Sequence, residues 1–317
     1  MKKFFKRCAA VLTVSVMTAG MLAGCGGGAA ETTAAETTVA ETAAADTTAA
    51  ETTTAAASET QVVGVDLNNL GPVLQEIYDR GTVIVGNDSS YPPFGFIDTS
   101  TNQAVGVEKE MATAIAAKLT EVLGKEITLD FQSMNFDAVL SSLSTGKINL
   151  VCSCCTVTEE RKKVMDFSDP YLQTKDVCLI LASNKDQYTS FEDFKDKRIA
   201  ANTGSSQEVR ANSISSHVTS TPTVSDAILQ LTANKVDAII VDNITAERYS
   251  VNSDNLYSFE LSDEDVAPVD KAVAMQLGND DLKAIVNAAV SEQVAAGNVE
   301  KWVTEYAKMA ADMGLNK

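Results

Sequence analysis

Apolar runs alternate with amphipathic segments from about residue 66 to the C-terminus. The run Thr82–Gly86 has the short, β-branched character of a buried strand, whereas Glu108–Val122 repeats apolar residues every three or four positions, as a helix does. Further strands are predicted at Ile127–Phe131, Ile148–Ser153, Arg198–Asn202 and Asp237–Val241. Further helices are predicted at Gly71–Arg80, Phe136–Ser144, Gln207–Ser215, Ala227–Asn234, Asp281–Ala296, Val299–Met313 and from Glu159 onward. This alternation predicts an α/β fold with mostly parallel sheet.

Capping residues mark the ends of two predicted helices. Asn135 precedes Phe136–Ser144, and Gly146 stands just beyond its end. Thr158 precedes the helix that begins at Glu159. Side chains of this kind accept a hydrogen bond from the first turn of a helix, so both residues are predicted N-caps.

The first 24 residues have the pattern of a signal peptide. Basic residues at positions 2, 3, 6 and 7 precede an apolar run over residues 9–22, which is shorter than a membrane span of about 20 apolar residues. The sequence LAGC at residues 22–25 matches the lipobox of bacterial lipoproteins. That match implies cleavage before Cys25 and lipidation of its thiol, which would anchor the protein without a spanning helix. An ordinary signal peptide with an incidental cysteine is the alternative.

Residues 25–65 are a region of low complexity. Acidic residues recur at positions 31, 36, 41, 46 and 51 with threonine and alanine between them, and residues 31–60 contain no lysine, arginine or aromatic residue. Such a segment buries too little apolar surface to fold, and its like charges extend it. It is predicted to be a disordered tether; an isolated alanine-rich helix is the alternative.

The charge of the chain limits its partners. The sequence has 43 acidic and 25 basic residues, with a formal net charge of −18. This balance argues against nucleic acid and against anionic lipid headgroups as partners, although it leaves a cation or a zwitterion open. The body from residue 66 to 317 is long enough for two lobes or one large domain.

Four cysteines lie in the body, namely Cys152, Cys154, Cys155 and Cys178. In an exported protein they can form a disulfide, which would have to include Cys178. No second cluster completes a four-ligand zinc site, so a metal role is the weakest interpretation. The preferred interpretation is four free cysteines that pack as small apolar residues.

Polar side chains end or follow four of the predicted strands. In an open α/β sheet, ligands bind outside the carboxyl ends of the strands, so these side chains are expected to meet in one crevice. They are Asp88, Tyr91, Ser153, Thr156, Arg161, Ser205, Ser206 and Asp242. Together they provide a guanidinium, two carboxylates and several hydroxyls, which suit the two poles of a zwitterion.

Arg161 lies in the first turn of a predicted helix. Helix starts usually favour acidic residues, because their backbone N–H groups carry partial positive charge. An arginine there adds to a positive field, and its planar fork suits a carboxylate. The alternative is a surface arginine within the charged run Glu159–Lys163.

The Ser205–Ser206 turn and Asp242 also have structural interpretations. Ser205 and Ser206 follow Gly204 in a hydroxyl-rich turn, which suits either ligand binding or plain N-capping. Asp242 ends a buried strand, where it can receive an ammonium group or cap the helix that Asn243 opens.

Two segments carry a resemblance to a known family. They are GNDSSYPPF at residues 86–94 and TVTEERKKVMDFSDPY at residues 156–171. The chain resembles family 3 of the bacterial extracellular solute-binding proteins, the amino-acid-binding capture subunits of ABC importers. This resemblance implies an α/β, two-lobed periplasmic-binding-protein-like fold (type II), with two mixed sheets flanked by helices and a ligand cleft between the lobes. It places lobe 1 at 66–176 and 275–317 and lobe 2 at 177–274, with hinge crossings near 175–181 and 271–277.

The resemblance also implies roles for the candidate residues. Arg161 matches the clamp of the ligand α-carboxylate, the Ser205–Ser206 turn matches further donors to that group, and Asp242 matches the acceptor of the amino group. Tyr91 and Phe136 match aromatics around the ligand side chain, although Phe136 also fits a core stripe of its helix.

Other features of the resemblance concern specificity and context. Asp88 matches a residue at the polar tip of the ligand, which favours a polar or cationic amino acid. Cys154 and Cys155 stand where that family has a Gly-Met type pair. The resemblance implies a monomer without a cofactor that works with ABC permease subunits at the outer face of the cytoplasmic membrane.

The sequence leaves two alternatives to transport open. One is a dehydratase-type enzyme on the same fold, in which Asp88 and Asp242 do acid–base work. His217, the only histidine, has no visible nucleophile partner in the sequence. The other is a sensory lipoprotein that presents its ligand to a receptor.

Overall fold

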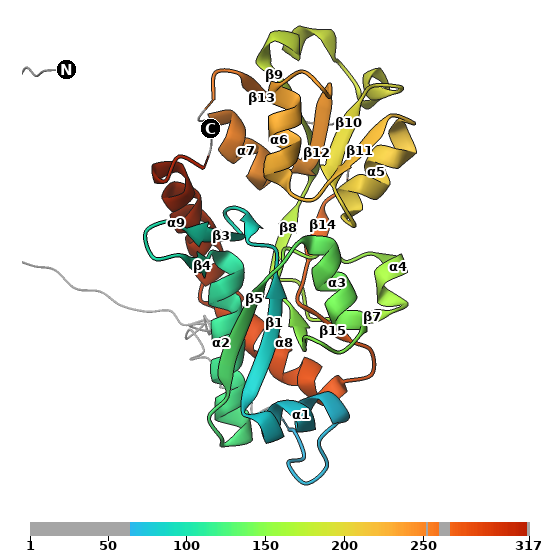
Figure 1. The fold of residues 1–317 in the computed structure, drawn as a ribbon. Helices are drawn as coiled ribbons and strands as arrows, with labels where there is room; N and C mark the ends of the chain where they lie inside the picture. The colour runs from blue at the N-terminus through green and yellow to red at the C-terminus, as the bar shows by residue number, and fades with distance from the viewer. Residues whose placement is uncertain (1–63, 252, 260–266, 316–317) are drawn as a thin grey trace, which may run out of the picture. The chain divides into compact units, whose positions relative to one another are not determined.

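The computed structural model describes residues 64–251, 253–259 and 267–315 (Figure 1). The signal peptide, the lipidation of Cys25 and nearly all of the predicted tether lie outside these residues. Within them, no helix has both the length and the apolar character that a membrane crossing needs. Two five-stranded sheets organise this part of the chain, and we call the halves built on them lobe 1 and lobe 2.

Lobe 1 is built on a mixed sheet in the order β5-β1-β6-β15-β7. Its strands are β1 (Thr82–Asn87), β5 (Thr128–Ser133), β6 (Leu150–Val151), β7 (Met165–Phe167) and β15 (Ala274–Gln276). Its helices are α1 (Pro72–Arg80), α2 (Val107–Leu123), α3 (Phe136–Ser144), α4 (Glu159–Lys162), α8 (Asp280–Ala295) and α9 (Asn298–Asp312). Strand β1 runs parallel to β5 and β6, whereas β15 runs antiparallel to β6 and β7.

Lobe 2 repeats this arrangement in the order β11-β10-β12-β9-β13. Its strands are β9 (Asp176–Leu181), β10 (Ile199–Asn202), β11 (Val218–Thr221), β12 (Ala238–Asp242) and β13 (Leu256–Phe259). Its helices are α5 (Ser206–Ile214), α6 (Val224–Thr232) and α7 (Asn243–Val251), with 3₁₀ turns η1 (Ala182–Gln187) and η2 (Phe191–Phe194). Strands β11, β10 and β12 are parallel, and β9 and β13 are the antiparallel additions.

Two short antiparallel groups complete the fold. Strands β8 (Leu172–Thr174) and β14 (Val269–Lys271) pair with each other between the two lobes (Figure 1). Strands β2 (Ser90–Tyr91), β3 (Gly95–Asp98) and β4 (Gln103–Val105) form a small sheet after β1. The pair β8–β14 therefore carries both chain crossings, one in each direction.

Each large sheet separates two hydrophobic clusters. In lobe 1, the neighbouring residues Leu150 and Val151 point into different clusters, the first shared with α2 and α8 and the second with α3. In lobe 2, Ile239 and Ile240 do the same. Because successive side chains of a strand point to opposite faces, helices cover both faces of both sheets.

The helical part of the sequence prediction is confirmed. Every predicted helix is present, with its ends displaced by at most three residues, and Phe136–Ser144 has the predicted bounds. The Thr158 Oγ1 atom accepts the Arg161 N–H at 3.2 Å, as an N-cap does, whereas Asn135 occupies the N-cap position without a side-chain hydrogen bond.

The strand prediction is less complete. The predicted strand Ile148–Ser153 is paired only as β6, because the chain leaves the sheet after Val151 and Cys154 takes a left-handed φ of 47°. The antiparallel strands, among them β13 and β15, were not predicted. The sheets are consequently mixed.

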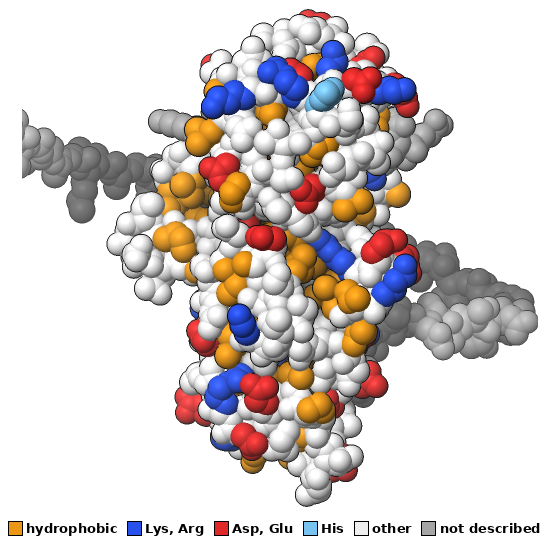
Figure 2. Space-filling view, turned by 45° about the vertical axis from the view of Figure 1, so that its right-hand side comes forward, with side chains coloured by type: hydrophobic (Ala, Val, Ile, Leu, Met, Phe, Trp, Pro, Cys, Tyr) orange, Lys and Arg blue, Asp and Glu red, His pale blue; other side chains and the backbone are white. Residues whose placement is uncertain are grey.

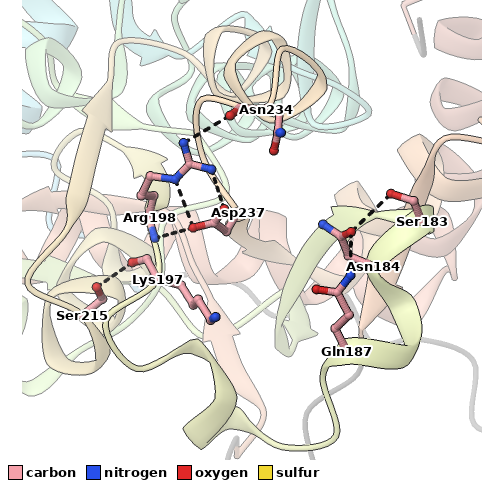
Figure 3. Close-up of polar contacts among 8 residues, drawn as sticks. All are labelled: Ser183, Asn184, Gln187, Lys197, Arg198, Ser215, Asn234 and Asp237. Carbon is pink, nitrogen blue, oxygen red and sulfur yellow. Dashed lines mark hydrogen bonds and ion pairs between the residues drawn. The ribbon is translucent and has the colours of Figure 1, made fainter.

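Arg198 and Asp237 join the amino-terminal ends of β10 and β12 in lobe 2. The guanidinium of Arg198 donates to the Asp237 carboxylate at 2.6 and 3.1 Å, and its backbone N–H donates to the same carboxylate at 2.9 Å (Figure 3). These contacts hold the pKa of Asp237 below its usual range. Asp237 thus directly precedes β12, one residue before the observed start of the strand that the sequence predicted at Asp237–Val241.

Candidate functional site

A pocket lies where the carboxyl ends of the parallel strands of both lobes meet. It encloses about 450 Å³ of space that includes its opening to solvent. Its lining residues are Asp88, Tyr91, Phe136, Ser153, Cys154, Thr156, Arg161, Asn202, Ser205, Ser206, Gln207, Val224, Ile240, Val241 and Lys271. Figure 2 shows hydrophobic, basic and acidic side chains together at mid-height of the face drawn.

Eight of the nine predicted site residues line this one pocket. Asp88, Tyr91, Phe136, Ser153, Thr156 and Arg161 come from lobe 1, and Ser205 and Ser206 come from lobe 2. Open α/β sheets place ligands at this end of the strands, and the two sheets turn these ends toward a shared space. The ninth residue, Asp242, is fully buried and is not part of the lining.

Arg161 presents a guanidinium without a countercharge. Its Nη1 atom donates to the Thr156 carbonyl at 2.7 Å, and its Nη2 atom donates across the lobes to the Gly204 carbonyl at 3.0 Å. The guanidinium also lies over the ring of Phe136, 5.4 Å from its centroid. It forms no ion pair with any carboxylate of the described residues. Its partners satisfy hydrogen bonds but leave its charge available for an anion.

Thr156 accepts hydrogen bonds from three different segments of the chain. Its Oγ1 atom accepts the Lys271 ammonium at 2.6 Å and the Ser206 hydroxyl at 3.0 Å, while its carbonyl accepts Arg161. A threonine hydroxyl has two acceptor sites and one proton. With both acceptor sites occupied, its own proton remains for an acceptor in the pocket.

Asp88 forms an acidic wall of the pocket. Its Oδ1 atom accepts the Ser90 N–H at 3.0 Å and the Ser90 hydroxyl at 2.6 Å, and its Oδ2 atom accepts the Asn202 amide of lobe 2 at 3.3 Å. The backbone N–H of Asp88 donates to Ser153 Oγ at 3.0 Å. Burial raises the pKa of Asp88, and the hydrogen bonds from Ser90 and Asn202 oppose that rise.

Asp242 lies behind the pocket wall and is joined to it through Tyr91. The Tyr91 hydroxyl of lobe 1 donates to Asp242 Oδ2 of lobe 2, and the Thr245 N–H donates to Oδ1 at 2.9 Å. Asp242 therefore caps α7, which is the structural role that the sequence left open. Burial, and then the charge of Asp242, raise the pKa of Tyr91 well above its usual range.

Ser205 and Ser206 act at the start of α5. Ser205 Oγ accepts the Glu208 N–H at 3.0 Å as N-cap and donates to the Asn202 carbonyl at 2.6 Å. Gly204, with φ of 77°, makes the turn that brings this helix start against Arg161. Ser205 thus has a capping role, whereas the Ser206 hydroxyl crosses to lobe 1.

Several lining residues were missed from the sequence. Asn202 is the last residue of a predicted strand, so its position at a strand end was the available signal. Lys271 lies on β14, an antiparallel strand without a recognisable pattern, and its lining position depends on the chain crossing between the lobes. Gln207 reaches the wall through the first turn of α5 and donates to Asp176 at 2.8 Å.

A buried carboxyl group supports the pocket wall from behind. Glu108 Oε1 accepts the Cys154 N–H at 2.9 Å and the Tyr171 hydroxyl at 2.7 Å, and Glu108 Oε2 has no hydrogen-bond partner. Burial raises the pKa of Glu108 to about 7, and Tyr171, Cys154 and the charge of Lys271 lower it in part. Glu108 thereby holds Cys154 in its left-handed conformation at the wall.

The four cysteines of the body are free and buried. Cys152 and Cys154 pack in one hydrophobic cluster of lobe 1, Cys155 in the other, and Cys178 in lobe 2. Burial raises the pKa of all four thiols. In the part of the chain that the structure describes, no group of three or more His, Cys, Asp or Glu side chains is arranged to hold a metal ion.

The fold and the pocket define the class of protein. Two α/β lobes, joined by two crossings and meeting at the carboxyl ends of their strands around a polar pocket, are the architecture of a two-lobed solute-binding protein. The chain belongs to the bacterial extracellular solute-binding proteins, family 3, whose family model matches residues 83–309.

Proteins and solved structures that are similar to this chain are named as amino-acid-binding proteins. The chain is 30% identical over 237 residues to the L-cystine-binding protein TcyJ of Escherichia coli, covering 73% of this chain and 85% of that protein. It is 30% identical over 224 residues to the arginine-binding extracellular protein ArtP of Bacillus subtilis, covering 69% and 83%. The amino acid ABC transporter substrate-binding protein AbpA of Streptococcus pneumoniae, solved with L-arginine, matches with a TM-score of 0.68 and 30% identity over 74% of this chain and 98% of that one.

Proposed function

We propose that this protein captures a free amino acid outside the cytoplasm and delivers it to the permease of an ABC importer. The single observation that carries the proposal is Arg161, whose guanidinium lies in a pocket lined from both lobes and forms no ion pair with a described carboxylate. Family membership and relatives named as cystine-, arginine- and histidine-binding proteins support the same function.

The carboxylate pole of the ligand is assigned to Arg161. Its guanidinium now donates to the Gly204 carbonyl of lobe 2, and a ligand carboxylate replaces that neutral acceptor with a charged one. Ser205 and Ser206, at the start of α5, line the same pocket from lobe 2. Closing the lobes therefore encloses the carboxylate between both halves.

The ammonium pole is assigned to Asp242. In the present arrangement the Tyr91 hydroxyl occupies its Oδ2 atom from the other lobe. Opening the lobes separates these two side chains and leaves Oδ2 for a ligand ammonium. Tyr91 and Phe136 then flank the ligand side chain.

The side-chain end of the pocket favours a polar or cationic amino acid, because Asp88 forms its wall. An amino acid with both charged ends paired in one cleft is expected to bind with micromolar or higher affinity, about −8 kcal/mol or better. Binding without turnover is proposed over dehydratase activity. In a test with prephenate or arogenate, the expected result is no product.

We further propose that the chain is a monomeric lipoprotein anchored through Cys25 at the outer face of the cytoplasmic membrane. The lipobox at residues 22–25 supports this proposal. Metabolic labelling with a palmitate analogue tests it: label is expected on the wild type and not on Cys25→Ser.

The experiment for ligand binding is a thermal-shift screen against the twenty common amino acids, cystine and ornithine, followed by calorimetry. A ligand at about 100 times its dissociation constant stabilises the protein by about 2.7 kcal/mol. Arg161→Ala is expected to abolish binding and keep the fold. Arg198→Ala is the matched control, because it removes an arginine that does not line the pocket and is engaged with Asp237 (Figure 3). Undiminished affinity of Arg161→Ala would refute the clamp.

A further inference from the structure

Lys271 is a buried cation that lines the pocket, and none of the ligand contacts proposed above is assigned to it. It lies at the end of β14, the strand that pairs with β8 between the lobes, and only 2% of its surface is exposed. Its ammonium reaches the pocket lining and donates to Thr156 Oγ1 at 2.6 Å. Its charge is therefore held at the crossing between the lobes, in the lining of the pocket.

Lys271 differs from the other buried lysine of the described residues in its partners. Lys118, which is 6% exposed, forms ion pairs with Glu121 and with Glu292, both at 2.6 Å. Lys271 forms no ion pair with a described carboxylate. A charge that is removed from water needs a countercharge, and Lys118 follows this rule where Lys271 does not.

Glu108 does not provide that countercharge. It is near enough for the charge of Lys271 to lower its pKa, yet its hydrogen bonds are to Cys154 and Tyr171. It lies behind the wall, and the two groups form no ion pair. Lys271 therefore has no ion-pair partner among the described residues, and the carboxylate of Asp88 in the same pocket forms no ion pair with it.

Arg161, a second cation without an ion pair among the described residues, stands beside Lys271. Arg161 donates to the Thr156 carbonyl, and Lys271 donates to the Thr156 hydroxyl, so both cations flank one residue. The Thr156 hydroxyl proton remains for an acceptor at the same place. A planar carboxylate has two oxygens and about four acceptor sites, which suffice for a guanidinium, an ammonium and a hydroxyl together.

We propose that Lys271 is a ligand-contacting residue that binds the α-carboxylate together with Arg161. The carboxylate pole then has two cations, one on α4 of lobe 1 and one on the strand that links the lobes. This inference rests on the proposed capture of an amino acid and adds a residue that sets specificity for the carboxylate over neutral end groups.

The test compares acids with their amides in calorimetry. The probes are L-arginine, L-histidine and L-cystine, together with the same molecules whose α-carboxylates are replaced by neutral carboxamides. The proteins are the wild type, Lys271→Met, Arg161→Ala and, as a charge-matched control, Lys163→Met at an exposed lysine outside the pocket. Lys271→Met is expected to weaken binding of the acids by roughly 10- to 100-fold and of the amides by less than about threefold. Lys163→Met is expected to change neither by more than about threefold.

A measurement without ligand separates this role from a structural one. Methionine fills similar volume and removes an uncompensated buried charge, so Lys271→Met is expected to raise the melting midpoint of the unliganded protein. If the ammonium merely held Thr156 in place, the midpoint would fall, and acids and amides would lose affinity equally. That combination overturns the proposal.

Two remaining outcomes separate the proposed role of Lys271 from the proposed capture of an amino acid. If the wild type binds the acids, Arg161→Ala does not, and Lys271→Met binds as the wild type does, then Lys271 has no ligand role and amino-acid capture stands. If the wild type binds none of the three acids in calorimetry nor any amino acid in the thermal-shift screen, capture fails and the role of Lys271 fails with it.

Discussion

Glu108 makes the stability of the protein depend on pH in a direction opposite to that of most carboxyl groups. The group is fully buried, one of its oxygens has no hydrogen-bond partner, and its pKa is raised from 4.5 to about 7. Between these two values the folded protein holds a proton that the unfolded chain has released. The free energy of unfolding therefore falls as pH rises through this window.

The magnitude follows from the shift. A difference of about 2.5 pH units at about 1.4 kcal/mol per unit amounts to roughly 3 kcal/mol, which is present at pH 4.5 and lost above pH 7. In Glu108→Gln the group stays neutral at every pH, and its carbonyl can still accept from Cys154 and Tyr171. The variant is expected to exceed the stability of the wild type by less than about 1 kcal/mol near pH 5 and by about 3 kcal/mol near pH 8.

The assay is urea unfolding of the unliganded protein at half-unit steps from pH 5 to 8. Only the difference between the wild type and the variant is interpreted, because other groups titrate in the same range. Glu126→Gln, at an exposed glutamate, serves as control and is expected to give a flat difference. A flat difference for Glu108→Gln, or a wild type that is more stable than the variant at pH 8, would refute the reasoning.

Two further predictions concern the wall of the pocket and the helix that carries Arg161. Cys154 has a left-handed φ of 47°, a backbone conformation that glycine adopts freely and alanine does not. Cys154→Gly is therefore expected to be more stable than Cys154→Ala by about 1 kcal/mol in urea unfolding. Equal stabilities of the two variants would contradict backbone strain at this position. Thr158→Ala removes the N-cap of α4, which is expected to cost about 1 kcal/mol and to weaken amino-acid binding several-fold in calorimetry, whereas Thr158→Ser is expected to preserve both. An affinity that is unchanged in Thr158→Ala would mean that α4 needs no cap to position Arg161.

The sequence predicted those parts of the molecule that depend on local pattern. Helical periodicity located α2 and α3, and the cap at Thr158 located the start of α4, because these signals lie within a few residues of one another. Arg161 could be singled out because a cation in a first helical turn is unusual, and the family resemblance gave it a role. The antiparallel strands could not be predicted, since they form by pairing segments far apart in sequence; β15, for example, pairs with β6 and β7.

The composition of the site was predictable only where a residue follows a parallel strand. Lys271 reaches the pocket through a chain crossing, and no short-range pattern marks that arrangement. Asp242 follows β12 as expected, yet whether its carboxylate faces the pocket or the start of α7 depends on the Tyr91 side chain from the other lobe. Glu108 lies in the first turn of α2, where an acidic residue is ordinary, so nothing in the sequence indicated its burial.

The antiparallel pair β8–β14 has a mechanical consequence. A single connecting strand would let one half of the molecule swivel and tilt in any direction about its attachment point. Two strands bonded side by side resist twisting against each other and bend together far more readily, so the relative motion of the halves reduces to rotation about one axis. Ligand binding then changes a single angle between the two halves. A membrane partner that contacts both halves at once can respond to that angle without contacting the ligand.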